Sequence, residues 1–79
     1  MRQKINEIIA KQYNGNHTLP LAKERLTEGA RLVADIGFDS LDTMEIIANC
    51  ENTFGVIFAE KQLRHIRTVG DIYKLFEGR

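Results

Sequence analysis

The segment between Gly37 and Gly55 constrains the fold of this chain more than any other part. At about 100° per residue, its apolar and polar side chains separate onto opposite sides of a helix. The apolar set is Ile46, Ile47, Cys50 and Phe54, and the polar set is Asp42, Glu45, Asn49, Asn52 and Thr53. The segment therefore predicts an amphipathic helix that has Ser40 at its N-cap and ends at Gly55, because serine caps helices well and glycine ends them.

A second apolar group lies beside the acidic side chains of this helix and consists of Leu41, Met44 and Ala48. A helix in a small bundle needs only one buried face, so this flank either contacts another molecule or widens the side that faces the core. Periodicity alone favours neither interpretation.

The N-terminal part of the chain predicts one helix followed by a long loop. Isoleucines at helical spacing indicate a first helix from about Arg2 to Tyr13, and Asn14-Gly15-Asn16 should stop it in a left-handed conformation. The stretch from there to Asp39 is long for so small a protein, and one helical turn between Arg25 and Val33 is possible. Its expected anchors in the core are Leu26, Leu32, Val33 and Ile36.

The C-terminal part predicts two more helices. Val56-Ile57-Phe58 should be a connector, because no other segment offers a strand to pair with it. Residues 59–65 indicate a short helix, and Thr68-Val69-Gly70-Asp71 resembles a capping box that opens a last helix ending near Glu77. Its inward side chains should be Val69, Ile72, Leu75 and Phe76. The expected architecture is an all-α four-helix bundle with one short helix and a long first loop, in a single domain over residues 1–79.

Composition narrows the class of protein. The 79 residues are 43% hydrophobic and 28% charged, which is typical of a small globular domain with one core. No apolar run approaches the roughly 20 residues that span a bilayer, and the N-terminus lacks the apolar core of a signal peptide, so a cytoplasmic protein is expected. Eleven basic and eleven acidic residues cancel, which argues against a general nucleic-acid or membrane-surface binder. One cysteine cannot form an internal disulfide, so the fold depends on packing.

Charges are unevenly distributed along the chain. Residues 35–51 contain five acids and no lysine or arginine: Asp35, Asp39, Asp42, Glu45 and Glu51. Residues 61–74 reverse the balance, with Lys61, Arg64, Arg67 and Lys74 against Asp71. These are either two ordinary solvated surfaces or an acidic patch for partners beside Ser40 and a separate basic patch.

The sequence does not predict an enzyme or a metal site. Ser40 lies in no Gly-x-Ser-x-Gly elbow, and the chain has no glycine-rich phosphate loop. His17 and His65 are not paired at a ligand or triad spacing, and Cys50 lies on the apolar face of its helix. We therefore interpret Cys50 as a core residue and His65 as a surface residue.

The motif Asp39-Ser40-Leu41, preceded by Asp35-Ile36-Gly37 and followed by Asp42 and Glu45, resembles the phosphopantetheine attachment motif of acyl carrier proteins. The resemblance covers most of the chain and is strongest over residues 35–54 and 66–72. It implies that Ser40 takes phosphopantetheine from coenzyme A through a phosphodiester, and that the terminal thiol of this arm carries acyl groups as thioesters. Such carriers serve fatty-acid, specialised lipid or polyketide biosynthesis.

The resemblance also implies partners: a phosphopantetheinyl transferase and acyl-activating or synthase enzymes, which act on a monomeric carrier. In the family these enzymes meet the helix that follows the serine. The matching positions here are Asp39, Leu41, Asp42, Met44, Glu45, Ala48 and Glu51.

Two departures from the family qualify this expectation. Typical fatty-acid carriers are strongly acidic, whereas this chain is neutral and places Lys61, Arg64 and Arg67 in and after its third helix. A specialised carrier with its own partner enzymes is therefore favoured. An aminoacyl carrier and an unmodified helical docking module are the alternatives. Replacement of Ser40 by alanine should cost about 1 kcal/mol in lost capping and leave a folded protein without an arm.

Overall fold

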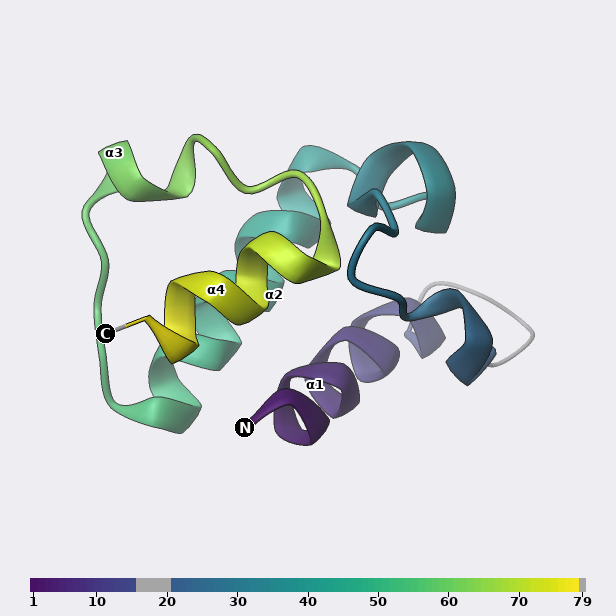
Figure 1. Cartoon of the computed structure of the whole chain (residues 1–79), viewed down its shortest axis with the longest axis horizontal. Coiled ribbons are helices and arrows are strands. Elements are labelled where there is room, and N and C mark those ends of the chain that lie inside the picture. Colours follow the sequence, from purple (N-terminus) through teal and green to yellow (C-terminus); the bar gives the residue numbers. More distant parts are fainter. Residues whose placement is uncertain (16–20, 79) are drawn as a thin grey trace.

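Helices account for all the regular secondary structure in the described part of the chain, residues 1–15 and 21–78 of a computed structural model (Figure 1). The elements are α1 (Arg2–Asn14), a 3₁₀ turn η1 (Lys23–Arg25), a π-helical turn η2 (Leu32–Ile36), α2 (Ser40–Phe54), α3 (Glu60–Leu63) and α4 (Val69–Glu77). Over these residues the prediction of an all-α fold with one short helix and a long first connection is confirmed.

The core is formed where the apolar faces of α1, α2 and α4 meet. Fully buried side chains come from each of these helices: Ile5, Ile9, Ile46, Cys50, Val69, Ile72 and Phe76. The ring of Phe76 contacts Phe54 and Phe58 at centroid distances of 5.5 and 5.1 Å. The predicted inward faces of α2 and α4 are thus confirmed, although Leu75 is only half-buried and Tyr73, which was not predicted, is buried.

The ends of α1 and α2 differ in conformation. Gly55 has φ 70°, and this left-handed residue ends α2 as expected. Gly15 follows α1 with φ −68°, so the prediction of a left-handed stop there is wrong for Gly15. Its N–H still bonds to the Lys11 carbonyl oxygen at 3.2 Å, which continues the helical pattern past Asn14. Asn16 lies outside the described residues.

The connection between α1 and α2 is tied to the start of α4 by backbone hydrogen bonds. The N–H of Leu32 donates to the Arg67 carbonyl at 2.9 Å, and the N–H of Gly70 donates to the Glu28 carbonyl at 2.8 Å. A Cβ at position 70 would lie 2.7 Å from that carbonyl oxygen, so the close approach requires glycine. The loop is therefore attached to the start of α4 at Glu28 and Leu32.

Three of the four predicted loop anchors contact the core. Leu32 and Ile36 are buried and Leu26 is half-buried, but Val33 is 60% exposed. The prediction for Val33 is wrong because residues 32–36 form a helical turn. This turn directs Leu32 and Ile36 into the core and Val33 into solvent. The connector at residues 56–58 is confirmed as non-strand, but Ile57 is 90% exposed.

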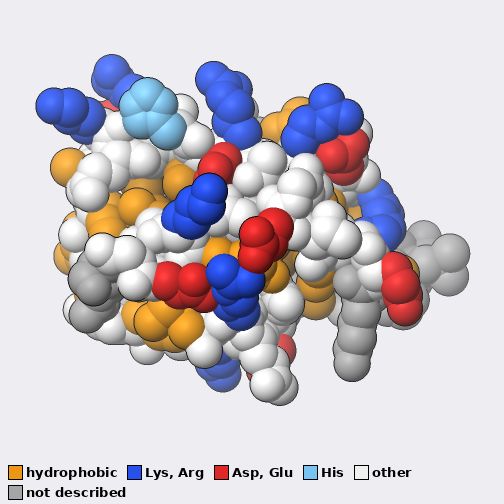
Figure 2. Space-filling view, in the orientation of Figure 1, with side chains coloured by type: hydrophobic (Ala, Val, Ile, Leu, Met, Phe, Trp, Pro, Cys, Tyr) orange, Lys and Arg blue, Asp and Glu red, His pale blue; other side chains and the backbone are white. Residues whose placement is uncertain are grey.

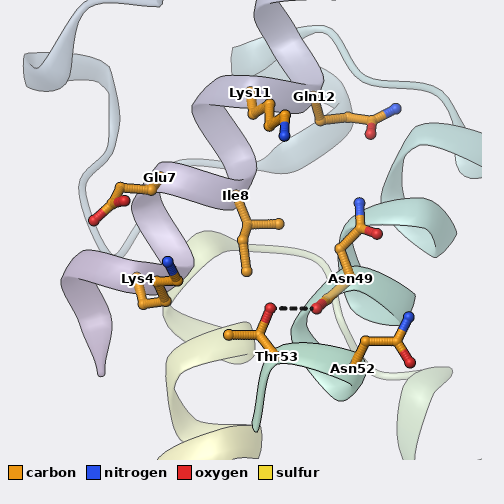
Figure 3. Close-up of a pocket in the computed structure, with 8 residues that line it drawn as sticks. All are labelled: Lys4, Glu7, Ile8, Lys11, Gln12, Asn49, Asn52 and Thr53. Atoms are coloured by element: carbon orange, nitrogen blue, oxygen red, sulfur yellow. Dashed lines mark hydrogen bonds between the residues drawn. The ribbon is translucent and has the colours of Figure 1, made fainter.

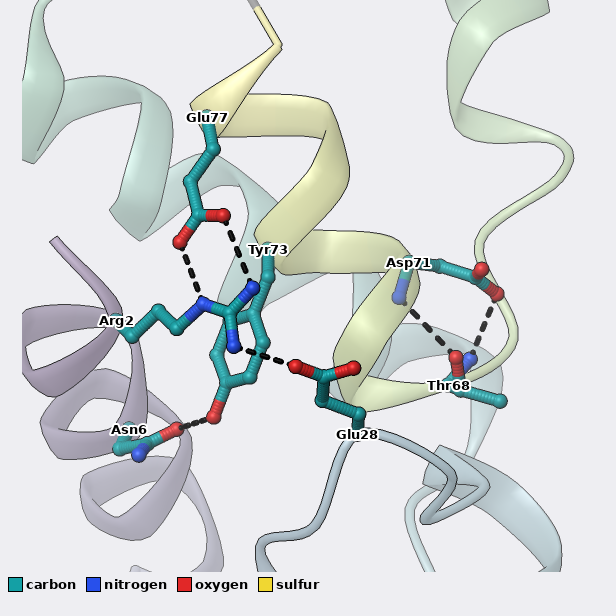
Figure 4. A network of polar contacts seen from close by, with 7 residues as sticks. All are labelled: Arg2, Asn6, Glu28, Thr68, Asp71, Tyr73 and Glu77. Carbon is teal, nitrogen blue, oxygen red and sulfur yellow. Dashed lines mark hydrogen bonds and ion pairs between the residues drawn. The ribbon is translucent and has the colours of Figure 1, made fainter.

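A polar network joins both ends of the described chain to this loop (Figure 4). The Arg2 guanidinium donates to the Glu77 carboxylate at 2.7 Å, pairs with Glu28 and lies over the Tyr73 ring, 4.7 Å from its centroid. The Tyr73 hydroxyl donates to the Asn6 side chain. The hydrogen bond from Arg2 lowers the pKa of the Glu77 carboxyl. These contacts link residues far apart in the sequence, which periodicity does not detect.

Candidate functional site

The start of α2 is capped by Asp39. The Asp39 carboxylate accepts from the N–H of Asp42 at 2.8 Å, and the Asp42 carboxylate accepts from the N–H of Asp39 at 3.3 Å. Together they form a capping box, in which Asp39 is the N-cap and Ser40 is the first helical residue. The prediction that Ser40 itself caps the helix is therefore wrong by one position.

The side chain of Ser40 consequently does not cap α2. Its side chain is exposed, and its hydroxyl forms no hydrogen bond with any described residue. It is also the only serine in the chain. The capping energy of about 1 kcal/mol that we expected to depend on Ser40 belongs to Asp39 instead.

The residues just before Ser40 fix its position. Gly37 has φ 96°, a left-handed conformation that turns the chain out of η2. Phe38 is 2% exposed and packs edge-on against the Tyr13 ring, with the centroids 6.1 Å apart. An exposed hydroxyl is thus held by a buried phenylalanine two residues earlier and by the helix that follows.

The apolar flank of α2 is not part of the core. Leu41 is 63% exposed and Met44 is 68% exposed, and Ala48 is also exposed. Ile46, Ile47 and Cys50 fill the core on the other side of the helix. The two interpretations that periodicity left open are therefore resolved in favour of a solvent-facing apolar flank beside Ser40.

Most of the acids expected to form a patch have partners within the protein. Asp35 pairs with Arg31 at 3.0 Å, and the hydrogen bond from that guanidinium lowers the pKa of Asp35. Glu51 is half-buried and accepts from the N–H of Phe58 at 2.8 Å. Asp42 accepts from the Gln12 side chain at 2.9 Å in addition to its capping bonds. Glu45 is exposed and forms no hydrogen bond or ion pair with the described residues, so it differs from these three.

A groove separates α1 from the polar stripe of α2 (Figure 3). Its lining residues are Lys4, Glu7, Ile8, Lys11, Gln12, Asn49, Asn52 and Thr53. The Thr53 hydroxyl donates to the Asn49 carbonyl at 2.8 Å, so it is engaged by its own helix. This groove contains amides, two lysines and a glutamate, and its α2 residues are those that the sequence assigned to the polar face.

The other candidate residues lie where the sequence placed them, or outside the described residues. Cys50 is completely buried, and burial raises the pKa of its thiol to about 12. His65 is exposed, as predicted. His17 falls outside the described residues.

Comparison with known proteins identifies the family of the chain. Residues 17–76 match a family described as a phosphopantetheine attachment site. The whole chain is 35% identical to an acyl carrier protein of Amoebophilus asiaticus and covers 91% of its length. The chain belongs to the acyl carrier protein family.

The fold of this acyl carrier protein agrees with that of a solved relative. It is similar to a provisionally assigned acyl carrier protein from Mycobacterium tuberculosis, with a TM-score of 0.81 and 27% sequence identity. The similarity covers 98% of this chain and 95% of the other. An acyl carrier protein is a carrier and not an enzyme, and its cofactor is a covalently attached phosphopantetheine.

The start of α2 fits such a cofactor. A covalent arm needs one accessible hydroxyl and no enclosing cavity, and Ser40 provides an exposed hydroxyl that no described residue engages. When attached, the arm supplies a terminal thiol that holds acyl groups as thioesters. No helix in the described residues has the length and apolar character needed to cross a bilayer.

Proposed function

We propose that Ser40 is the residue to which this acyl carrier protein attaches its phosphopantetheine. The observation that carries the proposal is an exposed hydroxyl, without a hydrogen bond to any described residue, at the start of α2. The hydroxyls of Thr43 and Thr53, on the same helix, donate to backbone carbonyls at 3.2 and 2.8 Å. The Ser40 hydroxyl therefore differs from both, because it can react without first breaking a hydrogen bond to a described residue.

The neighbouring residues hold Ser40 in place without restraining its hydroxyl. Asp39 and Asp42 define where α2 begins, so the Ser40 oxygen is free to bond to the phosphorus next to pantetheine. The pyrophosphate bond of coenzyme A would break in that step, adenosine 3′,5′-bisphosphate would leave, and the hydroxyl proton would pass to a base of the transferase. An exposed anion at a helix N-terminus gains only about 0.3–1 kcal/mol from the helix dipole. Since the bond is covalent, position and access matter more than this attraction.

Intact-mass measurement tests this assignment. We expect the wild-type protein, treated with a phosphopantetheinyl transferase and coenzyme A, to gain the mass of one phosphopantetheine. Ser40→Ala should gain nothing while unfolding within about 2 °C of the wild type. Thr53→Ala removes a hydroxyl from the far end of α2 and should be modified normally. A modified Ser40→Ala protein would show that the arm is attached elsewhere.

We further infer that the flank beside Ser40 is where the transferase and the acyl-activating or synthase enzymes dock. Exposed apolar side chains within one or two turns of the attachment point offer buried area to a partner, and Glu45 adds a charge that no described residue neutralises. Of the predicted partner residues, Asp39, Asp42 and Glu51 also stabilise the fold, so substitutions there would mix two effects.

Met44→Ala and Glu45→Lys separate docking from folding. Both side chains are exposed, and we expect each variant to lower kcat/KM of the transferase by about tenfold through KM. Ile57→Ala removes an exposed apolar side chain from the connector after α2 and is the matched control. Equal rates for all three variants and the wild type would exclude the α2 flank as the docking face.

Family membership supports the carrier over an unmodified docking module. The intact mass of the protein isolated from its native host will show the arm and whether its cargo is acyl or aminoacyl. The specialised pathway, the monomeric state and the cytoplasmic location remain predictions.

A further inference from the structure

Basic side chains gather at the end of the molecule where α2 begins. We define the α3 basic surface as Lys61, Arg64 and Arg67, which lie in α3 or just after it and are all exposed. Figure 2 shows lysine and arginine side chains along the edge of the molecule that Figure 1 assigns to α3 and the following linker. The proposed role of Ser40 does not explain this surface.

The linker after α3 lies against the first turn of α2. A second groove is lined by Arg31, Leu32, Val33, Ala34, Thr43, Ile66 and Arg67. Thr43 is three residues after Ser40, which places both on neighbouring positions of one helical turn. The backbone of Arg67 is fixed there because its carbonyl accepts from the N–H of Leu32 at 2.9 Å. Arg67, one of the three residues of the α3 basic surface, therefore lies beside the helical turn that carries the proposed attachment site.

The charges of this surface are poorly neutralised within the protein. Arg64 approaches Glu60 only to 3.9 Å, and their side chains are 73% and 86% exposed, so this pair contributes little. The side chains of Lys61 and Arg67 form no ion pair or hydrogen bond with the described residues. Arg31, in contrast, is paired with Asp35 through two guanidinium nitrogens at 3.0 Å.

A partner that docks over Ser40 is large enough to cover this surface as well. A typical interface buries about 800 Å² on each partner, which corresponds to a patch about 30 Å across. The two shorter dimensions of this molecule are 21 and 20 Å. Because Arg67 lines the same groove as Thr43, an interface of that size centred on Ser40 extends over the linker after α3.

We propose that the enzyme that receives or loads the acyl arm contacts the α3 basic surface through a cluster of its own aspartates and glutamates. This proposal rests on the attachment of the arm at Ser40. The docking face then has two contacts of opposite sign: Glu45 and the apolar flank on α2, and the α3 basic surface on the other side of Ser40. Such an arrangement orients the carrier, because a partner with the reverse charge order would be repelled on both sides.

A protein partner fits these charges better than an anionic membrane. Polybasic membrane-binding segments usually hold four to eight clustered lysines and arginines. The α3 basic surface has three, separated by uncharged residues, and Glu60 lies beside them. Asp39 and Glu45, near the same end, would be repelled by anionic lipids.

Charge reversal tests the proposal on purified enzymes. The probe is a panel of the acyl-activating ligases and condensing enzymes of the source organism, assayed with arm-bearing protein whose modification has been verified by intact mass. We compare wild type, Lys61→Glu/Arg64→Glu and the control Lys4→Glu/Lys11→Glu, which makes the same change in net charge on exposed α1 positions. Thermal unfolding of each variant verifies its fold.

At least one enzyme should lose tenfold or more in kcat/KM with the α3 variant and less than threefold with the α1 variant. The loss should shrink as salt is raised, and reversal of acidic residues on that enzyme should restore the rate. Equal kcat/KM values for the two variants with every enzyme overturn the proposal. It is also overturned if no enzyme of the panel accepts the arm-bearing wild type. Binding of the wild type, but not of the α3 variant, to vesicles with 30% phosphatidylglycerol, with unchanged enzyme rates, assigns the surface to a membrane instead. Failure of Ser40 to take an arm is detected beforehand, so the two proposals fail separately.

Discussion

The helices α2 and α4 begin with the same kind of cap, but the residue after the cap is exposed in one helix and buried in the other. Each opens with a box in which an N-cap side chain accepts from the N–H of an aspartate three residues later, Asp39 with Asp42 and Thr68 with Asp71. The residue after the cap is an exposed serine in α2 and a fully buried valine in α4. A capping box therefore shows where a helix starts. Whether the residue after the cap exposes its side chain to solvent or packs it into the core is shown only by its burial.

Reciprocal substitutions at these two positions should give the largest contrast. Val69→Ser removes a buried side chain and buries a hydroxyl, and we expect it to lower the free energy of unfolding by about 3 kcal/mol. Ser40→Val should change it by less than about 0.5 kcal/mol, because the position is exposed. Urea denaturation measures both. Similar losses at the two positions would show that α2 and α4 begin in equivalent environments.

The second residue of α4 is also constrained by packing. Gly70→Ala places a methyl group 2.7 Å from the Glu28 carbonyl oxygen, and we expect a loss of about 2 kcal/mol. Gly29→Ala is the control, because a Cβ there meets nothing within 4 Å. It should change the free energy of unfolding by less than about 0.5 kcal/mol. Equal stability of the two variants would argue that the loop yields to the added methyl group.

The caps themselves should contribute comparable, smaller amounts. Asp39→Ala and Thr68→Ala each remove an N-cap acceptor and should lower the free energy of unfolding by about 1 kcal/mol. Ser40→Ala should cost only a few tenths, since Ser40 caps nothing. If Ser40→Ala proved more destabilising than Asp39→Ala, the register of the cap would be wrong.

Acidification should weaken the α4 cap. Burial tends to raise the pKa of Asp71, but the hydrogen bonds from the N–H groups of Arg67 and Thr68 outweigh it and lower the pKa below the usual 3.8. A carboxyl whose pKa is lowered by folding stabilises the folded state above its unfolded pKa and loses that contribution as pH falls. Melting temperatures from about pH 6 to pH 3 should therefore fall less steeply for Asp71→Asn than for wild type. A steeper fall would contradict this assignment.

The features of this structure that depend on residues close together in the sequence could be predicted. The periodicity of α2 and α4, the left-handed Gly55 and the cap at Thr68 all depend on residues a few positions apart. The cap of α2 was misplaced by one residue because Asp39 and Ser40 are both good N-cap residues. Asp39 and Asp42 have the same three-residue spacing as Thr68 and Asp71. This spacing identifies Asp39, and not Ser40, as the N-cap residue of α2.

The features that were missed depend on distant contacts. Burial of Tyr73 depends on Arg2 and Asn6 in α1, and the engagement of Glu51 depends on the path of the chain at Phe58. Val33 lies within the π-helical turn η2, and the 3.6-residue periodicity of an α-helix does not predict which side chains such a turn buries. For the site, the exposure of Ser40 and of the α2 flank required the packing of the whole bundle, because periodicity left the flank undecided.

Enclosure of the single cysteine has a practical consequence. Cys50 is inaccessible, and its thiol remains protonated at neutral pH because its pKa is about 12. A maleimide therefore finds no reactive sulfur on the bare polypeptide and one on the form whose arm carries no acyl group. Labelling stoichiometry then measures the fraction of protein whose arm thiol is free, because neither the bare polypeptide nor an acylated arm offers a reactive sulfur. Burial of Cys50 also prevents thioester exchange onto a second sulfur within the protein.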